Sequence, residues 1–198
     1  MKAKTVIVTG ASHGIGAGLV KAFLGRGYNV MANSRNISKS GTFEISDKLA
    51  LVDGRIAEEA TSKFGSIDAL GNNAGIFFAK SFTDYTIEDL RSLSSVNIEG
   101  FLFISQLAIK QMLVQKTGGS IVNISTTMAD HPIAGINCAV AMITKGGLEA
   151  VTRSLAMEYA KEISEVKDIV DAIVYLTEAH QVTGEVLHVD GGAHVGKW

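Results

Sequence analysis

The stretch Val6-Ile7-Val8-Thr9-Gly10-Ala11-Ser12-His13-Gly14-Ile15-Gly16 stands near the start of the chain and decides its fold. The β-branched run from Thr5 to Thr9 is too short for a helix and predicts a buried strand. Three glycines follow, and the apolar segment from Leu19 to Leu24 predicts a helix after them. A strand, a glycine turn and a helix in this order present backbone N–H groups and a helix N-terminus to a phosphate.

The glycines give this turn its binding chemistry. A Cβ at these positions would block the tight turn itself or the close approach of a pyrophosphate. Taken alone, a glycine turn has a plainer interpretation, which is a tight connection between a strand and a helix. The residues that would bind a cofactor here are Gly10, Ser12, His13, Gly14, Ile15 and Gly16.

Composition limits the class of protein. The 198 residues are 46% hydrophobic, which is enough to bury the core of one domain over residues 1–198. The 18 Lys and Arg nearly cancel the 20 Asp and Glu, which argues against a nucleic-acid partner. The single cysteine, Cys138, excludes an internal disulfide or cysteine metal cluster and fits a reducing cytoplasm. The same cysteine count leads us to expect no metal. A strand that begins this early leaves no room for a leader peptide, and no apolar run reaches membrane-spanning length, so we expect no membrane partner.

A second motif, Asn72-Asn73-Ala74-Gly75, ends the strand predicted to start at Ile67 to Leu70. Together with the Gly-x-x-x-Gly-x-Gly spacing of the first turn, it resembles the short-chain dehydrogenase/reductase family, and the resemblance covers nearly all of residues 4–192. It implies an α/β fold, a doubly wound parallel sheet of the Rossmann type with helices on both faces. It also implies a nicotinamide cofactor at the carboxyl ends of the strands, bound in part by Asn73, Ala74 and Gly75.

The end of the second predicted strand, Tyr28 to Asn33, bears on the choice of cofactor. In a dinucleotide fold this position meets the adenosine ribose, where an acidic residue would bind the 2′-hydroxyl of NAD. Ser34 and Arg35 stand there instead, and they suit a 2′-phosphate because Arg binds phosphate through two hydrogen bonds. We therefore favour NADP(H) over NAD(H); a solvated loop residue is the plainer interpretation of Arg35. After the third predicted strand, Lys48 to Val52, Arg55 replaces an acidic residue that contacts adenine in the family, and Asp53 is the nearest substitute.

A long helix is predicted after the sequence Thr86-Ile87-Glu88-Asp89, which has the pattern of an N-terminal capping box. Asn97 lies on the apolar stripe of this helix, where a polar side chain must find hydrogen bonds or destabilise the core. The resemblance assigns Asn97 to the family's active-site asparagine, which bends the helix and holds a water of the proton relay. A satisfied core asparagine is the alternative.

The resemblance assigns two further catalytic positions. The fifth predicted strand, Gly119 to Ser125, ends where the family has a serine that polarises the substrate carbonyl, and Thr126 takes that place, with Ser125 and Thr127 as alternates. Hydroxyls that only satisfy a strand end are the plainer interpretation. Lys145, in the helix predicted over residues 139–159, would bind the nicotinamide ribose and lower the pKa of a tyrosine one turn earlier.

That tyrosine is absent, because its position is Ala141. None of the four tyrosines can replace it by spacing. Two other proton donors are conceivable: a water held by Asn97 and Lys145, or His131 in the loop after the fifth strand. An exposed loop residue is the plainer interpretation of His131.

A second departure falls between residues 161 and 162, where one helix pattern is followed at once by another. The residues from Val166 to Val174 repeat at helical spacing and predict an amphipathic helix. Relatives place a sixth strand and a substrate loop between these helices, on the order of 30 residues or more. The range Val182 to Gly192 still matches the family's last strand. If the protein itself lacked this segment, the last strand would have no neighbour to pair with. We therefore favour the alternative that the segment exists in the protein and is left out of this sequence.

These observations predict an NADP(H)-dependent oxidoreductase that moves a hydride between nicotinamide and a small carbonyl or alcohol substrate. A nucleotide-binding sensor or scaffold with little or no catalysis is the rival, favoured by Ala141. A purely structural subunit comes third. By resemblance we also expect a homodimer or homotetramer.

Overall fold

The structure of the chain, a computed structural model, describes residues 3–54, 59–159, 166–182 and 187–189. The chain divides into two compact units, Met1–Leu148 and Glu149–Trp198. The first unit contains the sheet and most of the predicted site residues. The second contains the end of α5 (Ala139–Tyr159) and α6 (Val166–Glu178).

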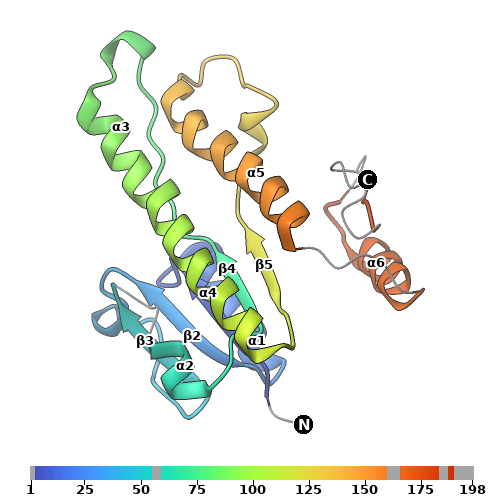
Figure 1. Ribbon diagram of the computed structural model, residues 1–198. Coiled ribbons are helices and arrows are strands. Elements are labelled where there is room, and N and C mark those ends of the chain that lie inside the picture. The colour runs from blue at the N-terminus through green and yellow to red at the C-terminus, as the bar shows by residue number, and fades with distance from the viewer. Residues whose placement is uncertain (1–2, 55–58, 160–165, 183–186, 190–198) are drawn as a thin grey trace. The chain divides into compact units, whose positions relative to one another are not determined.

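Five parallel strands form the sheet of the first unit (Figure 1), in the spatial order β3-β2-β1-β4-β5. The order reverses between β1 and β4, and ligands of open parallel sheets bind outside the carboxyl ends of the strands at such a point. All five strands predicted for this unit are found, within two residues of their predicted bounds except at the end of β4, which stops at the first residue of the predicted motif Asn72 to Gly75. They are β1 Thr5–Thr9, β2 Asn29–Ser34, β3 Leu49–Asp53, β4 Ala69–Asn72 and β5 Ser120–Asn123.

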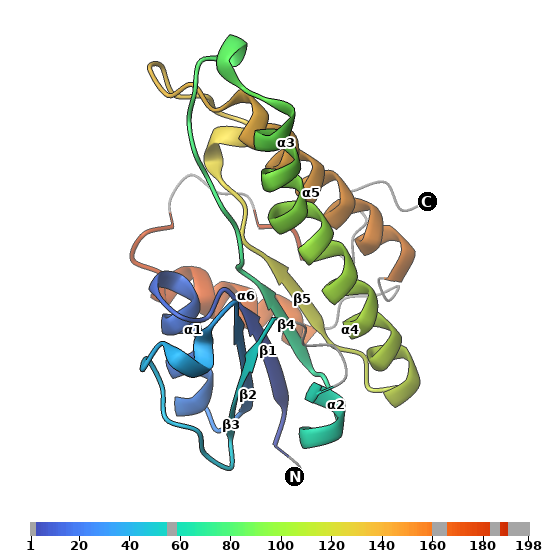
Figure 2. The ribbon, with the colours of Figure 1, turned by 90° about the vertical axis from the view of Figure 1, so that its left-hand side faces the viewer.

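Helices cover both faces of this sheet, as predicted. α1 (Gly14–Gly25) lies on one side, and α2 (Glu59–Phe64) and α4 (Phe101–Gln115) lie on the other (Figure 2). Side chains of β1 alternate between two buried clusters, with Val6 packed in the α1 layer and Ile7 in the α2 and α4 layer. Burial on both faces explains why the strand is apolar at successive positions rather than at every second one.

The predicted capping box begins α3 (Ile87–Ser94): the Thr86 hydroxyl accepts a hydrogen bond from the Asp89 amide, and the Asp89 carboxylate accepts one from the Thr86 amide. The helix continues through a π-type segment, η3 (Ser95–Gly100), into α4. Asn97 lies inside this segment. Single π turns within α-helices are frequent at functional sites.

Among the described residues, the helical stretch Ile87–Gln115 is long and apolar enough to cross a membrane by length and composition alone. Its most apolar window of 18 residues has a mean hydropathy of 1.2 and is 28% buried. This corrects the expectation that no segment reaches such a length. Core helices pass the same test, and Ala108 and Met112 of this stretch pack in the sheet's buried cluster.

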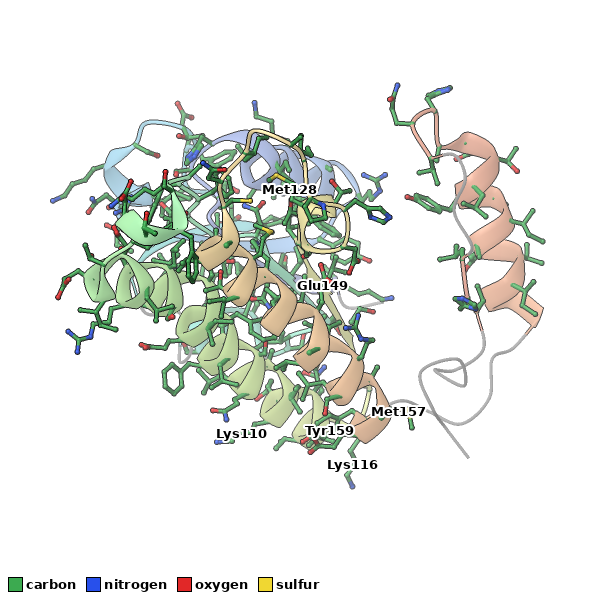
Figure 3. The ribbon with its side chains drawn as sticks, turned by 90° about the horizontal axis from the view of Figure 1, so that it is seen from above. Lys110, Lys116, Met128, Glu149, Met157 and Tyr159 are labelled. Atoms are coloured by element: carbon green, nitrogen blue, oxygen red, sulfur yellow. The ribbon has the colours of Figure 1, made fainter. Side chains whose placement is uncertain are left out.

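A third buried cluster lies between the loop after β4, the start of α3 and the start of α5. Its fully buried members include Leu93 and Ala141, and Met128 from the short helix η4 (Thr127–Ala129) packs against it. Met128 is labelled in Figure 3. Two more short helices, η1 (Ile37–Lys39) and η2 (Phe82–Asp84), lie in the loops after β2 and β4.

In the second unit, the predicted amphipathic helix is confirmed as α6, and its apolar side chains Ile169, Val170, Ile173 and Val174 are each about half exposed. The strand predicted within Val182 to Gly192 is wrong for the described part of that range, since residue 182 and residues 187–189 contain no strand. A strand needs a partner strand to satisfy its backbone groups, and the described residues after β5 contain no strand that could pair with this segment. The join at 161/162 lies outside the described residues.

Candidate active site

Three glycines shape the turn after β1. Gly10 and Gly14 have φ of +62° and +54°, the left-handed region that favours glycine. Gly16 has no such φ, but a Cβ there would lie 2.2 Å from the carbonyl oxygen of Gly10. A Cβ on Gly14 would meet nothing within 4 Å, so open space lies over the turn where the pyrophosphate is predicted to approach.

The N-terminus of α1 follows this turn directly. His13 is its N-cap residue, but no side chain caps the helix and its first turn contains no acidic residue. The Ser12 hydroxyl lies 3.0 Å from His13 Nδ1, and the side chain of Ile15 is exposed. The first N–H groups of a helix have no partner within it and carry the positive end of its dipole. This end of α1 can therefore accept an anion.

Asn73 holds the glycine turn against the end of β4. Its Nδ2 donates to the carbonyl oxygens of Thr9 and Gly10, at 3.0 and 3.1 Å. The Thr9 hydroxyl in turn accepts from the amides of Asn73 and Ala74, at 3.0 and 2.9 Å. Both amide hydrogens of Asn73 are used, so this side chain shapes the turn. Thr9 was not predicted to shape this turn. The signal for it in the sequence is a polar side chain at the end of a buried strand.

Asn72 ties the same strand end to its neighbours. Its Nδ2 donates to the hydroxyl of Ser105 in α4 and to Oδ1 of Asn123 in β5, at 3.0 and 2.9 Å. Its own Oδ1 is buried and has no hydrogen-bond partner in the described part of the chain. The carboxyl ends of β4 and β5 are thereby fixed to each other.

At the end of β2, Asn33 fastens the neighbouring strand. Its buried Nδ2 donates to the carbonyl oxygens of Val52 and Gly54, at 2.9 and 2.7 Å. Ser34 accepts a backbone hydrogen bond from Gly54, at 3.1 Å. Arg35 is exposed and makes no hydrogen bond or ion pair with the described residues. Its guanidinium is available to a ligand at the position predicted for a 2′-phosphate.

Asn97 is buried, and both hydrogens of its side-chain amide are donated in hydrogen bonds. Its Nδ2 donates to the Ile76 carbonyl and to the Thr144 hydroxyl, both at 3.0 Å, and its Oδ1 accepts from the Ile76 amide at 2.9 Å. These contacts favour the interpretation as a satisfied core asparagine that links the exit of β4 to α5. Ile76 and Thr144 were not singled out in the sequence; a hydroxyl next to Lys145 on an apolar helix face was the sign for Thr144.

Lys145 lies at the carboxyl ends of β4 and β5. Its Nζ donates to the carbonyl oxygen of Ile124 at 2.7 Å. A Cβ built on Gly75 would lie 3.5 Å from this Nζ and 3.4 Å from Asn97 Oδ1. The structure therefore brings together three of the predicted site residues, Gly75, Asn97 and Lys145.

Of the three hydroxyl residues after β5, Thr126 takes part in a local turn. Thr126 is the N-cap of η4, and its hydroxyl accepts from the Met128 amide at 3.3 Å. That bond leaves the Thr126 hydroxyl hydrogen free to donate to a ligand. His131 is exposed in the loop that follows.

Ala141 is 1% exposed and belongs to the third buried cluster, with Leu93, Cys138 and Val140. Its carbonyl oxygen accepts a hydrogen bond from the Thr144 hydroxyl at 2.7 Å. The position at which the sequence predicts the family's phenol is thus an apolar packing position in this chain.

Residues 4–185 match the short chain dehydrogenase family. The chain belongs to this family. An uncharacterised oxidoreductase of Methylorubrum extorquens is 31% identical, over 93% of this chain and 78% of that protein. L-xylulose reductase of Mesocricetus auratus is 27% identical, over 96% of both chains. Among solved structures, the ligand-free aldohexose dehydrogenase of Thermoplasma acidophilum has a TM-score of 0.70 at 29% identity, over 80% of this chain.

The short-chain dehydrogenase described here is shorter than these relatives. It spans 62% of the length of the Thermoplasma enzyme. Its alignment with the L-xylulose reductase of Mesocricetus auratus runs over 236 residues, although the chain has 198. At least 38 aligned positions, the difference between those two lengths, therefore have no residue in this chain.

The fold and the family make this chain an oxidoreductase that uses a nicotinamide cofactor and a small-molecule substrate. The glycine turn, the bare N-terminus of α1 and Lys145 lie at the carboxyl ends of the strands, where cofactors of such folds bind. No cluster of His, Cys, Asp and Glu that could hold a metal ion is found in the described ranges.

Proposed function

We propose that this short-chain dehydrogenase transfers a hydride between NADP(H) and a carbonyl or alcohol substrate. The observation that carries the preference for NADP(H) is Arg35, exposed at the end of β2 and without a partner among the described residues. A free guanidinium recognises a phosphate through charge-assisted hydrogen bonds. No acidic side chain stands at this position to bind the 2′-hydroxyl of NAD(H).

The residues present fit such a cofactor. The open space over Gly14 and the uncapped start of α1 would receive the pyrophosphate. Gly75 leaves room beside Lys145, whose ammonium would bind the nicotinamide ribose. When bound, the nicotinamide supplies or accepts the hydride.

The chain's own residues would then orient the substrate and move the proton. The hydroxyl of Thr126 can donate to the substrate oxygen, because its bond from the Met128 amide uses only a lone pair. Asn97 acts through Ile76 and Thr144 by fixing the end of β4 relative to Lys145. The proton donor that replaces the phenol is proposed to be a water at Lys145 or the side chain of His131.

A second candidate is supported by Ala141, whose burial in an apolar cluster puts no titratable group where the family has its phenol. Positioned acid–base catalysis contributes about 10²–10⁴-fold to rate, so its loss leaves a protein that binds cofactor and reacts slowly. Such a protein would sense or scaffold through its cofactor state. The expected homodimer or homotetramer, the cytoplasmic location and the absence of nucleic-acid or membrane partners remain proposals in both cases.

The experiment is a fluorescence titration with NADPH and NADH, followed by turnover assays on ketones, aldehydes and sugars. We expect NADPH to bind more tightly by about 1–3 kcal/mol, the value of charge-assisted hydrogen bonds. Equal affinities, or tighter binding of NADH, would contradict the cofactor proposal. Oxidation of NADPH by a carbonyl substrate supports the enzyme, whereas tight binding without turnover supports the second candidate.

A further inference from the structure

Asp53, the last residue of β3, holds the turn that follows β2. Its Oδ1 accepts a hydrogen bond from the Ser38 amide at 2.9 Å, and its Oδ2 accepts one from the Ser38 hydroxyl. Ser38 is the middle residue of η1, three residues after Arg35. The carboxylate thus caps the short helix that begins just beyond the proposed phosphate ligand.

Further contacts fasten both ends of the same turn. On one side, Asn33 and Ser34 are bonded to the end of β3 through Gly54. On the other side, the side chain of Ile37 is fully buried in the α1 layer. Between these anchors, Arg35 and Asn36 are exposed. The position of the Arg35 backbone therefore depends on a few contacts, and the Asp53 carboxylate supplies two of them.

We propose that Asp53 is a positioning residue for recognition of the 2′-phosphate: by holding Ser38 it fixes the turn that presents the Arg35 guanidinium. The inference rests on the proposed preference for NADP(H). It gives Asp53 a role that does not depend on a contact with adenine, because its two oxygens accept from Ser38 within the chain itself. A guanidinium recognises phosphate through a rigid fork of donors, so its approach must be set by the backbone that carries it.

The charge of Asp53 makes the idea easy to test. The hydroxyl and amide of Ser38 hold the pKa of the Asp53 carboxyl below its usual range, so the group is negative at neutral pH. A negative charge near a bound phosphate repels it. Through charge alone, Asp53→Asn would strengthen binding of a 2′-phosphate; through the loss of the anchor, it would weaken binding. The two roles predict opposite signs.

The probes are adenosine 2′,5′-bisphosphate and 5′-AMP, which differ only in the 2′-phosphate and require no turnover. We expect Asp53→Asn and Ser38→Ala to weaken bisphosphate binding by about tenfold, the effect of one charge-assisted hydrogen bond, and 5′-AMP binding by less than about twofold. Ser38→Thr keeps the hydroxyl and should restore the affinity. Asp47→Asn removes the same charge from an exposed position before β3 and should leave both affinities unchanged.

Thermal unfolding of each variant checks that the fold is kept, and Ser38→Ala, a small change at an exposed residue, provides the result if Asp53→Asn does not fold. Tighter bisphosphate binding by Asp53→Asn would overturn the inference in favour of simple repulsion. Equal losses for the two probes would overturn it in favour of an adenine contact. If the wild-type chain binds both probes equally, the proposed NADP(H) preference itself fails, which is a separate outcome.

Discussion

At the scale of single residues, Gly16 and Gly18 lie in the first turns of α1 with very different surroundings. A Cβ on Gly16 would lie 2.2 Å from the Gly10 carbonyl oxygen and 2.7 Å from Asn73 Nδ2. A Cβ on Gly18 would meet nothing within 4 Å. One glycine is thus required by the glycine turn, whereas the other is only a weak point in a helix.

This contrast makes a matched pair of variants. Gly16→Ala should lose NADPH binding and destabilise the fold by about 1–3 kcal/mol, because the methyl group pushes the turn away from Asn73. Gly18→Ala should gain about 0.5–1 kcal/mol of stability and keep cofactor affinity, because alanine restricts the unfolded helix segment. Urea unfolding and fluorescence titration measure both effects. Unchanged NADPH affinity in Gly16→Ala would mean that the turn has no part in binding.

The glycine turn was predictable from the sequence because its strand, glycines and helix are neighbours in the chain. The hydrogen bonds that hold this turn in place were less predictable. Thr9 and Asn73 are 64 residues apart, and Asn33 reaches 19 and 21 residues to Val52 and Gly54. Which polar side chain meets which backbone group depends on the packing of the strands, and no local pattern encodes it.

At the scale of elements, the start of α3 depends on Asp89. Its carboxylate accepts from Lys80 Nζ at 2.6 Å and from the Thr86 amide at 2.9 Å. The hydrogen bond from the Lys80 ammonium is the largest cause that holds the pKa of this carboxyl below its usual range, and the hydrogen bond from the Thr86 amide is the second largest. A pKa lowered in the folded state stabilises the fold above the unfolded-state pKa, and this contribution is lost as pH falls through the folded-state pKa.

Asp89→Asn should therefore lower stability at neutral pH, and the difference from the wild-type chain should shrink below about pH 4, where the unfolded carboxyl takes up its proton. Urea unfolding midpoints between pH 7 and pH 3 provide the measurement. Glu88→Gln is the control, because the Glu88 carboxylate is exposed and makes only a weak surface pair with Arg91, at a long distance of 3.9 Å from Nη1. A constant difference at all pH values would show that the Asp89 charge does not matter.

Elements were predictable where their pattern was local. The five β-branched or apolar runs of the first unit became strands, and the capping box fixed the start of α3. The π-type segment around Asn97 was expected only as a bend, since it follows from a side chain that bonds to Ile76 and Thr144 on other elements. The last strand failed for the same reason: pairing is a property of two segments, and the described residues after β5 contain no strand to pair with it.

At the scale of the whole molecule, the outward face of α4 needs an explanation. Phe103 and Val114 lie three helical turns apart on this face and are 58% and 76% exposed. Lys110, labelled in Figure 3, stands between them in the sequence of the same helix. Exposed apolar surface of this kind marks an interaction site. The homo-oligomer predicted from the sequence makes a second copy of the chain the expected partner. We therefore expect α4 to pack against its symmetry mate.

Light scattering after gel filtration should give the wild-type chain a mass of two or more copies of 20.9 kDa. Phe103→Glu combined with Val114→Glu should shift it to one copy, because four carboxylates, two from each copy, would be buried together at a two-fold axis. Ile45→Glu is the control, since its side chain is also exposed but lies in the loop before β3. A monomeric wild-type chain, or a double variant that keeps its mass, would contradict this role of α4. If the wild-type chain instead sediments with lipid vesicles, the apolar stretch Ile87–Gln115 acts at a membrane rather than between subunits.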